Sequence, residues 1–204
     1  MEKQRCEWAN RNPLEMMYHD TEWGRKSEDD RYLFEMLILE GMQSGLSWTT
    51  IIAKREGMRE AFANFEPARL IRFTEEDVER LVLNPNIIRH RLKIQAVISN
   101  AHAYYKLTEI HDSLAKFLWH YVDYKPIINH YNDMSEVPAS TPLSIQISKD
   151  LKKLGFKFVG PTTIYALMQA VGMVDKHRYH LLFCIAPFFR IDVENRNTSD
   201  NNFK

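Results

Sequence analysis

The chain has 204 residues, 27 acidic and 27 basic residues, and a hydrophobic fraction of 45%. A chain of this length can bury a large core, and the composition excludes a fibrous or wholly disordered protein. Because the net charge is zero, any surface for nucleic acid has to be a local feature. Two cysteines, no apolar leader and no long apolar run predict a cytoplasmic protein without a disulfide framework or membrane span.

Hydrophobic spacing predicts helices along most of the chain, and strand-like alternation is limited to the four residues FKFV. We therefore expect an all-α fold. Helix-starting signals are Ser47, the pair Thr74 and Asp77, and Thr141-Pro142. Apolar residues recur at helical spacing within 31–41, 48–52, 87–105, 114–121, 143–154 and 164–171.

We expect one helical domain over residues 1–194, followed by a polar, frayed tail over residues 195–204. The most plausible linker inside the domain is the polar, proline-containing stretch 123–140.

The segment LKKLGFKFVGPTTIYALM, residues 151–168, predicts a helix, a six-residue turn bounded by Gly155 and Gly160, and a second helix. One interpretation is an ordinary αα-hairpin, whose glycines supply left-handed conformations. The other is a helix-hairpin-helix, residues 142–174, that binds a DNA phosphate through turn amides and the positive end of the second helix. Lysines surround the turn beside one acid, Asp150: Lys149, Lys152, Lys153 and Lys157.

Residues 85–106 contain basic side chains and no acid. They form either the charged outer face of a long helix or a second phosphate-contacting patch. The basic residues include Arg89, His90, Arg91, Lys93 and Lys106.

Residues 5–24, RCEWANRNPLEMMYHDTEWG, are rich in aromatic residues without helical spacing, and predict either core packing or an irregular segment that stacks on a planar ring.

Glu40 ends an apolar helix face. Such a carboxylate either points to solvent or, if buried, serves a cationic or donor-rich ligand. In the buried case Gly41 and Gly45 would give a ligand close access, and Trp48 would offer a flat surface.

Cys6 and His19 are candidate zinc ligands, with His177 and either His180 or Cys184 completing a tetrahedral set. The spacing alone is weak, and a buried thiol with satisfied histidines is the alternative.

Four segments together resemble the 3-methyladenine DNA glycosylase I family. They are RCEWANRNPLEMMYHDTEWG, LFEMLILEGMQSGLSWTTIIAKR, NIIRHRLKIQAVISNAHAYY and LKKLGFKFVGPTTIYALMQAVGM, spread over residues 5–174. The resemblance implies an all-helical, helix-hairpin-helix enzyme that flips 3-methyladenine out of alkylated double-stranded DNA and releases it by hydrolysis. The sequence gives no signal for the oligomeric state, and a monomer is our default expectation.

Site residues follow from the same resemblance. Glu40 of LEG is the implied catalytic residue, which recognises the extruded base. Leu46 is the side chain inserted into the duplex, and Gly155, Lys157 and Gly160 contact DNA from the hairpin. The implied base-binding residues are Tyr18, Trp48 and Trp8.

Two positions depart from the family pattern. Glu15 stands where a tyrosine is common, which replaces a stacking surface with a second carboxylate. Leu181 stands where the family has its fourth zinc ligand, a cysteine, so Cys6, His19 and His177 need His180 or Cys184 to complete a structural zinc site. A non-catalytic DNA-binding or lesion-binding module that retains the hairpin is therefore the alternative function.

Overall fold

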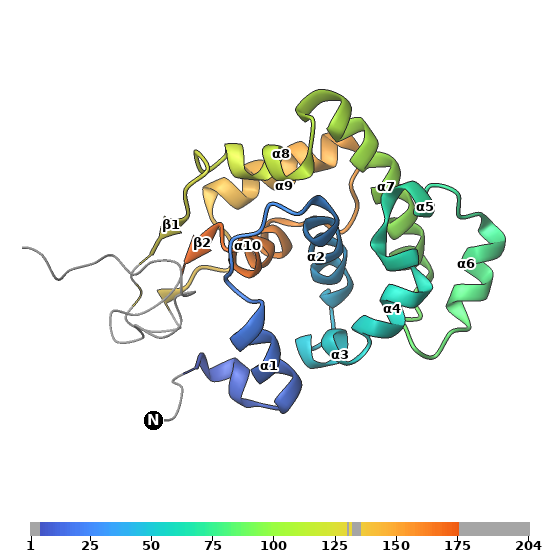
Figure 1. Ribbon diagram of the computed structural model, residues 1–204, viewed down its shortest axis with the longest axis horizontal. Helices are drawn as coiled ribbons and strands as arrows, with labels where there is room; N and C mark the ends of the chain where they lie inside the picture. The colour runs from blue at the N-terminus through green and yellow to red at the C-terminus, as the bar shows by residue number, and fades with distance from the viewer. Residues whose placement is uncertain (1–4, 130, 132–135, 176–204) are drawn as a thin grey trace, which may run out of the picture.

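The computed structural model describes residues 5–129, 131 and 136–175 (Figure 1). The predicted tail 195–204, the domain boundary at residue 194 and the candidate ligands His177, His180 and Cys184 lie outside this range.

Helices dominate the described residues, which confirms the all-α prediction. The only strands in this part of the chain are β1 and β2, which pair in parallel through Ile127 with Val174 and Ile128 with Asp175. In chain order the elements are η1 (Glu7–Asn10), α1 (Pro13–Thr21), α2 (Asp30–Gln43), α3 (Trp48–Ala53), α4 (Arg55–Ala61), η2 (Ala63–Phe65), α5 (Pro67–Leu70), α6 (Glu75–Val82), α7 (Arg91–His111), α8 (Leu114–His120), β1 (Ile127–Ile128), α9 (Pro142–Leu154), α10 (Pro161–Ala170) and β2 (Val174–Asp175), where η denotes a 3-10 helix.

The helix-starting signals of the sequence are used as predicted. Thr74 and Asp77 form a capping box at the start of α6. The Thr141 side chain accepts a hydrogen bond from the amide of Ser144 at the start of α9. Ser47 caps α3 in the same way, by accepting from Thr50. Each cap satisfies an amide that the first helical turn leaves without a partner.

Helix α2 lies at the centre of the molecule, with α10 beside it in Figure 1. Every residue of α2 from Leu33 to Met42 is buried. A helix that is enclosed on all sides is expected to be apolar all round. The two carboxylates within this buried stretch, Glu35 and Glu40, therefore need a specific explanation.

Asp30, at the start of α2, fixes this helix to α7 and α8. Its carboxylate accepts hydrogen bonds from the Tyr104 hydroxyl at 2.8 Å and from the amides of Leu114 and Ala115 at 2.9 and 2.8 Å. Asp30 thus caps α8 with negative charge at its amino end, the favourable position in the helix dipole.

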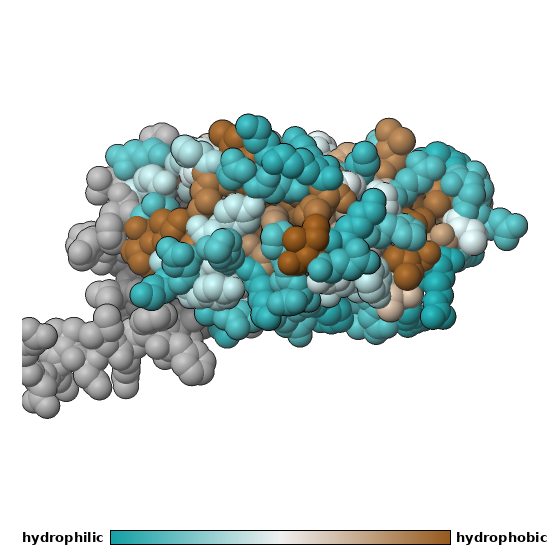
Figure 2. Space-filling model, turned by 90° about the horizontal axis from the view of Figure 1, so that it is seen from above, coloured by the Kyte–Doolittle hydropathy of each residue, from teal (hydrophilic) through white to brown (hydrophobic). Residues whose placement is uncertain are grey.

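Hydrophilic side chains cover most of the face seen in Figure 2, where hydrophobic residues occur in small separate groups. Among the described residues, none of the helices combines the length and apolar character needed to span a bilayer.

Candidate functional site

Four aromatic residues from separate elements meet at one place and form what we call the aromatic cluster: Trp8, Tyr18, Trp23 and Trp48. The Tyr18 and Trp48 rings lie 5.3 Å apart between centroids, and Trp8 lies 6.3 Å from Tyr18 and 5.4 Å from Trp23. These distances are those of interacting aromatic pairs. The structure thus brings together the three predicted base-binding residues, Tyr18, Trp48 and Trp8.

The expectation that residues 5–24 are irregular is wrong for most of this segment. Residues Pro13–Thr21 form α1, because the Asn12 side chain accepts a hydrogen bond from the amide of Glu15 and Pro13 occupies the first helical position. Tyr18 and His19 consequently sit on a helix, and Trp8 sits on the short η1.

Glu40 is buried, with 6% of its surface exposed, so its carboxylate does not point into solvent. Burial raises the pKa of Tyr18, and the Glu40 carboxylate is the next largest cause. Glu40 is therefore close enough to act on the phenol electrostatically. The raised pKa keeps the Tyr18 hydroxyl protonated, so that it remains a hydrogen-bond donor.

Several buried polar atoms in and beside the aromatic cluster have no hydrogen-bond partner within the described residues. They include the Tyr18 hydroxyl, the indole nitrogen of Trp48 and Oε2 of Glu15. Leaving one such group unsatisfied costs about 1–3 kcal/mol, so native structures rarely do so. A group of them in one place is the pattern expected where a ligand with donors and acceptors binds.

Glu15, the departure from the family pattern, is buried with 2% of its surface exposed. Its Oε1 accepts a hydrogen bond from the hydroxyl of Thr49 at 2.6 Å, between α1 and α3. The residue precedes Tyr18 by three positions, so both side chains project from neighbouring parts of α1. The second carboxylate is therefore an internal feature next to the Tyr18–Trp48 pair.

The turn 44–47, between α2 and α3, exposes the predicted inserting residue. Leu46 has 40% of its surface exposed, so its side chain is accessible from solvent. Gly45 has a φ of +78°, a conformation that glycine adopts without strain, and no atom lies within 4 Å of a β-carbon built there. Gly45 thus makes the turn that presents Leu46.

Gly41 has a different role from the one that we expected. A β-carbon at this position would lie 3.1 Å from Cβ and 3.2 Å from the carbonyl oxygen of Phe158. The space at Gly41 is therefore filled by the turn that follows α9, and the expectation that Gly41 admits a ligand is wrong.

The turn 155–160 connects α9 and α10, as predicted. Gly155 ends α9 with a φ of +100°. Gly160 has a φ of −63°, so the expectation of a left-handed glycine at both ends of the turn holds only for Gly155. The Lys157 side chain is exposed. Of the four lysines near this turn, Lys153 forms an ion pair with Asp150 at 2.8 Å.

The basic stretch 85–106 does not form a continuous phosphate-contacting patch. Arg91 forms ion pairs with Glu75 at 3.0 Å and with Glu79 at 2.6 Å. Lys93 is buried and points into the protein. Besides the ion-paired Arg91, the exposed basic side chains of this stretch are Arg89, His90, His102 and Lys106.

Cys6 and His19 lie next to each other, as a shared zinc site requires. The backbone amide of Cys6 is 3.4 Å from Nε2 of His19, and Nδ1 of His19 is 3.2 Å from Oδ1 of Asp20. A carboxylate on the second ring nitrogen is the usual way to orient a metal-binding histidine. Within the described ranges, no group of three or more possible metal ligands is present.

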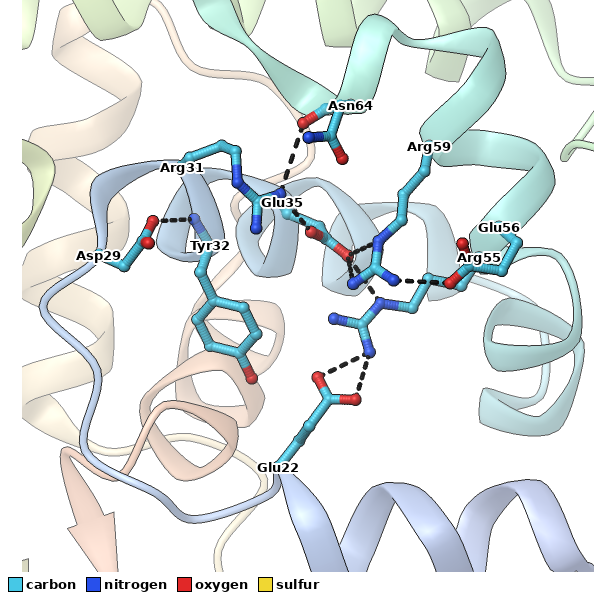
Figure 3. Close-up of polar contacts among 9 residues, drawn as sticks. All are labelled: Glu22, Asp29, Arg31, Tyr32, Glu35, Arg55, Glu56, Arg59 and Asn64. Carbon is cyan, nitrogen blue, oxygen red and sulfur yellow. Dashed lines mark hydrogen bonds and ion pairs between the residues drawn. The ribbon is translucent and has the colours of Figure 1, made fainter.

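The sequence analysis missed one cluster of charged residues, which is centred on the buried Glu35 and Arg55. We call it the arginine network: Glu22, Arg31, Glu35, Arg55 and Arg59 (Figure 3). Glu35 accepts hydrogen bonds from Nε of Arg55 at 2.6 Å and from Nε of Arg59 at 2.8 Å. Arg31 donates to its other oxygen at 2.9 Å. The only sequence signal was an acid in the middle of an apolar run, LFEMLIL.

Known proteins resemble this chain over most of its length. The family model for methyladenine glycosylase matches residues 8–184. DNA-3-methyladenine glycosylase 1 of Escherichia coli (strain K12) is 48% identical over 174 residues, which are 85% of this chain and 93% of that protein. Two solved structures are also similar. A crystal structure of 3-methyladenine DNA glycosylase I has a TM-score of 0.85 at 49% identity and covers 88% of this chain and 99% of that one. A structure on 3-methyladenine recognition by the Staphylococcus aureus enzyme has a TM-score of 0.83 at 39% identity, with coverages of 86% and 93%. The chain therefore belongs to the methyladenine glycosylase family.

Proposed function

We propose that this protein is a DNA glycosylase that releases 3-methyladenine from alkylated double-stranded DNA. The observation that carries the proposal is the buried Glu40 carboxylate acting on Tyr18. The Tyr18 hydroxyl and the indole nitrogen of the neighbouring Trp48 have no hydrogen-bond partner among the residues that the structure describes. Its relatives are named for activity on 3-methyladenine, and one solved relative is described by its recognition of that base.

The chemistry of the base matches these side chains. Methylation at N3 gives adenine a positive charge and makes it a good leaving group. Each well-placed aromatic face attracts such a cation by roughly 0.5–2 kcal/mol. The Glu40 carboxylate accepts charge-assisted hydrogen bonds from the base and favours its charged form. The hydroxyl of Tyr18 and the indole N–H of Trp48 supply the donors.

Access to the base requires that it leave the duplex. A base within the stack cannot be reached, so the enzyme flips it out, and a side chain fills the space. Leu46 supplies this side chain, because it is apolar, exposed and held in a tight turn. Water then attacks the sugar carbon. The residues from Pro161 to Val174 contain no acid that would serve as a catalytic base, and this is consistent with a leaving group that is already charged.

The turn 155–160 is the proposed DNA-binding hairpin. Its amides and the amino end of α10 would face a phosphate, and the exposed Lys157 would add a cation.

We further propose that Cys6, His19 and His177 hold a structural zinc ion, with His180 or Cys184 as fourth ligand. The zinc ion would cross-link two distant parts of the chain and would take no part in the reaction. The metal content of the purified protein tests this. That the protein is a cytoplasmic monomer stays a prediction.

The activity is tested by incubating the protein with methylated duplex DNA and measuring free 3-methyladenine. Glu40→Gln is expected to reduce release by about 10²-fold, which is typical for removal of a positioned charged partner. The matched control is Glu109→Gln, an exposed residue of α7, which should release base at the wild-type rate.

Two outcomes contradict the proposal. If wild-type protein releases no more base than Glu40→Gln, the enzyme assignment fails. If it then still binds abasic DNA with strong salt dependence, the alternative of a non-catalytic lesion-binding module is supported instead.

A further inference from the structure

Two turns would contact DNA if the proposed function is correct: the turn 44–47, which carries Leu46, and the turn 155–160, which carries Lys157. They are more than 100 residues apart in sequence, yet both are attached to α7. We propose that Lys93 and Asn100 of α7 are positioning residues that set the spacing of these two turns, so that the inserting leucine and the phosphate-binding hairpin engage one duplex together. This inference rests on the proposed function.

Lys93 binds the carboxyl end of α2. Its Nζ donates to the carbonyl oxygen of Met42 at 2.8 Å and to that of Ser44 at 2.6 Å. The last carbonyls of a helix have no partner within the helix, and a cation placed there is favourable for the dipole as well. Only 7% of Lys93 is exposed, and no carboxylate of the described residues pairs with it. The ammonium group therefore serves the turn 44–47 and is not available to a phosphate.

Asn100 binds the turn 155–160 with both ends of its amide. Its Oδ1 accepts from the amide of Lys157 at 2.7 Å, and its Nδ2 donates to the carbonyl oxygen of the same residue at 3.1 Å. Asn100 is 2% exposed. The pair of bonds fixes the backbone at Lys157 and leaves the lysine side chain in solvent.

The two anchors lie on one face of one helix. Residues seven apart on an α-helix are separated by two turns, about 10 Å along its axis. Between them, Ala96 and Val97 of α7 line the same small gap as Gly41 and Phe158. Because Gly41 lacks a β-carbon, Phe158 packs directly on α2. Both turns are thus attached to α7, and the turn 155–160 also packs on α2, so the rigid helix α7 fixes their spacing.

A purely structural role is the competing explanation, since buried anchors also stabilise a fold. The two roles differ in what they change. Loss of spacing weakens binding to a duplex, which needs both turns at once, and leaves free 3-methyladenine binding at the aromatic cluster unaffected. General loss of structure weakens both kinds of binding together.

The test compares Lys93→Met, Asn100→Leu and the double variant. A matched control is Lys116→Met on α8, an exposed lysine paired only with Asp112. Affinity is measured for a duplex containing an abasic-site analogue and, by tryptophan fluorescence, for free 3-methyladenine. We expect each single variant to bind the duplex about 10-fold more weakly, because each loses one well-placed hydrogen-bonding side chain. The affinity for free 3-methyladenine should stay unchanged. Lys116→Met should match wild type in both assays.

The double variant tests whether the two anchors act jointly. Residues this far apart without a shared role give additive losses. If Lys93 and Asn100 set one spacing, the first substitution already disrupts that spacing. The loss of duplex affinity in the double variant should then be much smaller than about 100-fold, which is the loss that two additive effects of about 10-fold would give. Lys93→Gln keeps a hydrogen-bond donor, so its duplex affinity should lie between those of wild type and Lys93→Met. It replaces Lys93→Met in the comparison if that variant does not fold.

The proposal is overturned by unchanged duplex affinity, by parallel loss of duplex and free-base affinity, or by additive losses in the double variant. None of these outcomes depends on turnover. Absence of base release by the wild-type protein would refute the proposed enzyme and leave these binding results interpretable.

Discussion

Glu35 and Glu40 are two buried carboxylates on the same helix, and their surroundings differ. Glu35 is completely buried and is held by three arginines of the arginine network. Glu40 acts on Tyr18 in the aromatic cluster, where the Tyr18 hydroxyl and the Trp48 indole nitrogen lack partners in the described part of the chain. Within the described residues, Nη2 of Arg55 is the one buried side-chain atom of the network without a hydrogen-bond partner, whereas the cluster has two such donors, the Tyr18 hydroxyl and the Trp48 indole nitrogen. The first arrangement stabilises the fold, and the second is suited to an incoming ligand.

The arginine network also fixes the geometry of the aromatic cluster. Arg55 of α4 donates to both oxygens of Glu22, just after α1, at 2.8 and 2.7 Å, and to Glu35 of α2 at 2.6 Å. Burial raises the pKa of Glu35, but Arg55 and Arg59 outweigh it, and the net pKa is lowered. The network thereby joins the helices that carry Tyr18 and Glu40.

The largest expected effect is on stability, from Glu35→Gln. Removing this charge leaves Arg55 and Arg59 buried or half-buried without their common partner. We expect the free energy of unfolding to fall by about 3–5 kcal/mol, as when one member of a buried ion pair is removed. Urea denaturation measures this. The folded fraction should still bind free 3-methyladenine, and a loss under 1 kcal/mol would show that the network is not stabilising.

The control for this change is Glu56→Gln, because Glu56 pairs with Arg59 on the surface and is 78% exposed. The free energy of unfolding of Glu56→Gln should stay within about 0.5 kcal/mol of wild type.

The pH dependence of stability gives a second check on Glu35. Since folding lowers the pKa of Glu35, its contribution is present above the unfolded pKa, about 4.3, and is lost as pH falls through the folded pKa. Wild-type stability should therefore decline below about pH 4 more steeply than that of Glu35→Gln.

An effect of the opposite kind is expected from Tyr18→Phe. This change removes a buried hydroxyl that has no partner within residues 5–129, 131 and 136–175, so the free energy of unfolding should stay constant or rise by about 1 kcal/mol. Affinity for 3-methyladenine should fall by about 10-fold, because one donor to the base is lost. Paired denaturation and fluorescence titrations measure both. If the variant is markedly destabilised and its affinity for the base is unchanged, Tyr18 stabilises the fold, as the arginine network does, and does not bind the base.

The smallest effect is expected from Glu15→Gln. The amide retains an acceptor for the Thr49 hydroxyl and removes the charge from a buried carboxylate oxygen without a partner. We expect stability to rise by about 1 kcal/mol or less. Removing a negative charge beside Tyr18 should also reduce the preference for cationic 3-methyladenine over neutral adenine by a few-fold. Equal preference in both proteins would mean that Glu15 does not act on the base.

Local chemistry made much of the fold predictable. Thr141 starts a helix because its hydroxyl accepts from the amide three residues ahead, and Thr74 starts one because the Asp77 carboxylate accepts from its amide. Gly155 ends a helix because it tolerates a positive φ. Three residues of the aromatic cluster, Tyr18, Trp48 and Trp8, were predicted together with Glu40 from the resemblance to the glycosylase family.

Tertiary contacts account for what the sequence did not indicate. Gly41 was assigned to ligand access, yet it accommodates Phe158 from a turn more than 100 residues away. Lys93 was grouped with surface cations, but it caps α2 from the inside. Glu35 and Arg55 were not singled out from the sequence, yet they form the buried centre of the arginine network. No local pattern reveals these roles, because each depends on which helices become neighbours.

The most direct test of the central claim is a tryptophan-fluorescence titration of the purified protein with free 3-methyladenine and with adenine, for wild type and Glu40→Gln. Both Trp48 and Trp8 lie within the aromatic cluster and should report occupancy there. We predict saturable binding of 3-methyladenine by wild type, at least about 10-fold tighter than adenine, and loss of that preference in Glu40→Gln. Equal affinity for the two bases in wild type, or a preference that survives in Glu40→Gln, would contradict the assignment of a cation-binding site to Glu40 and the aromatic cluster.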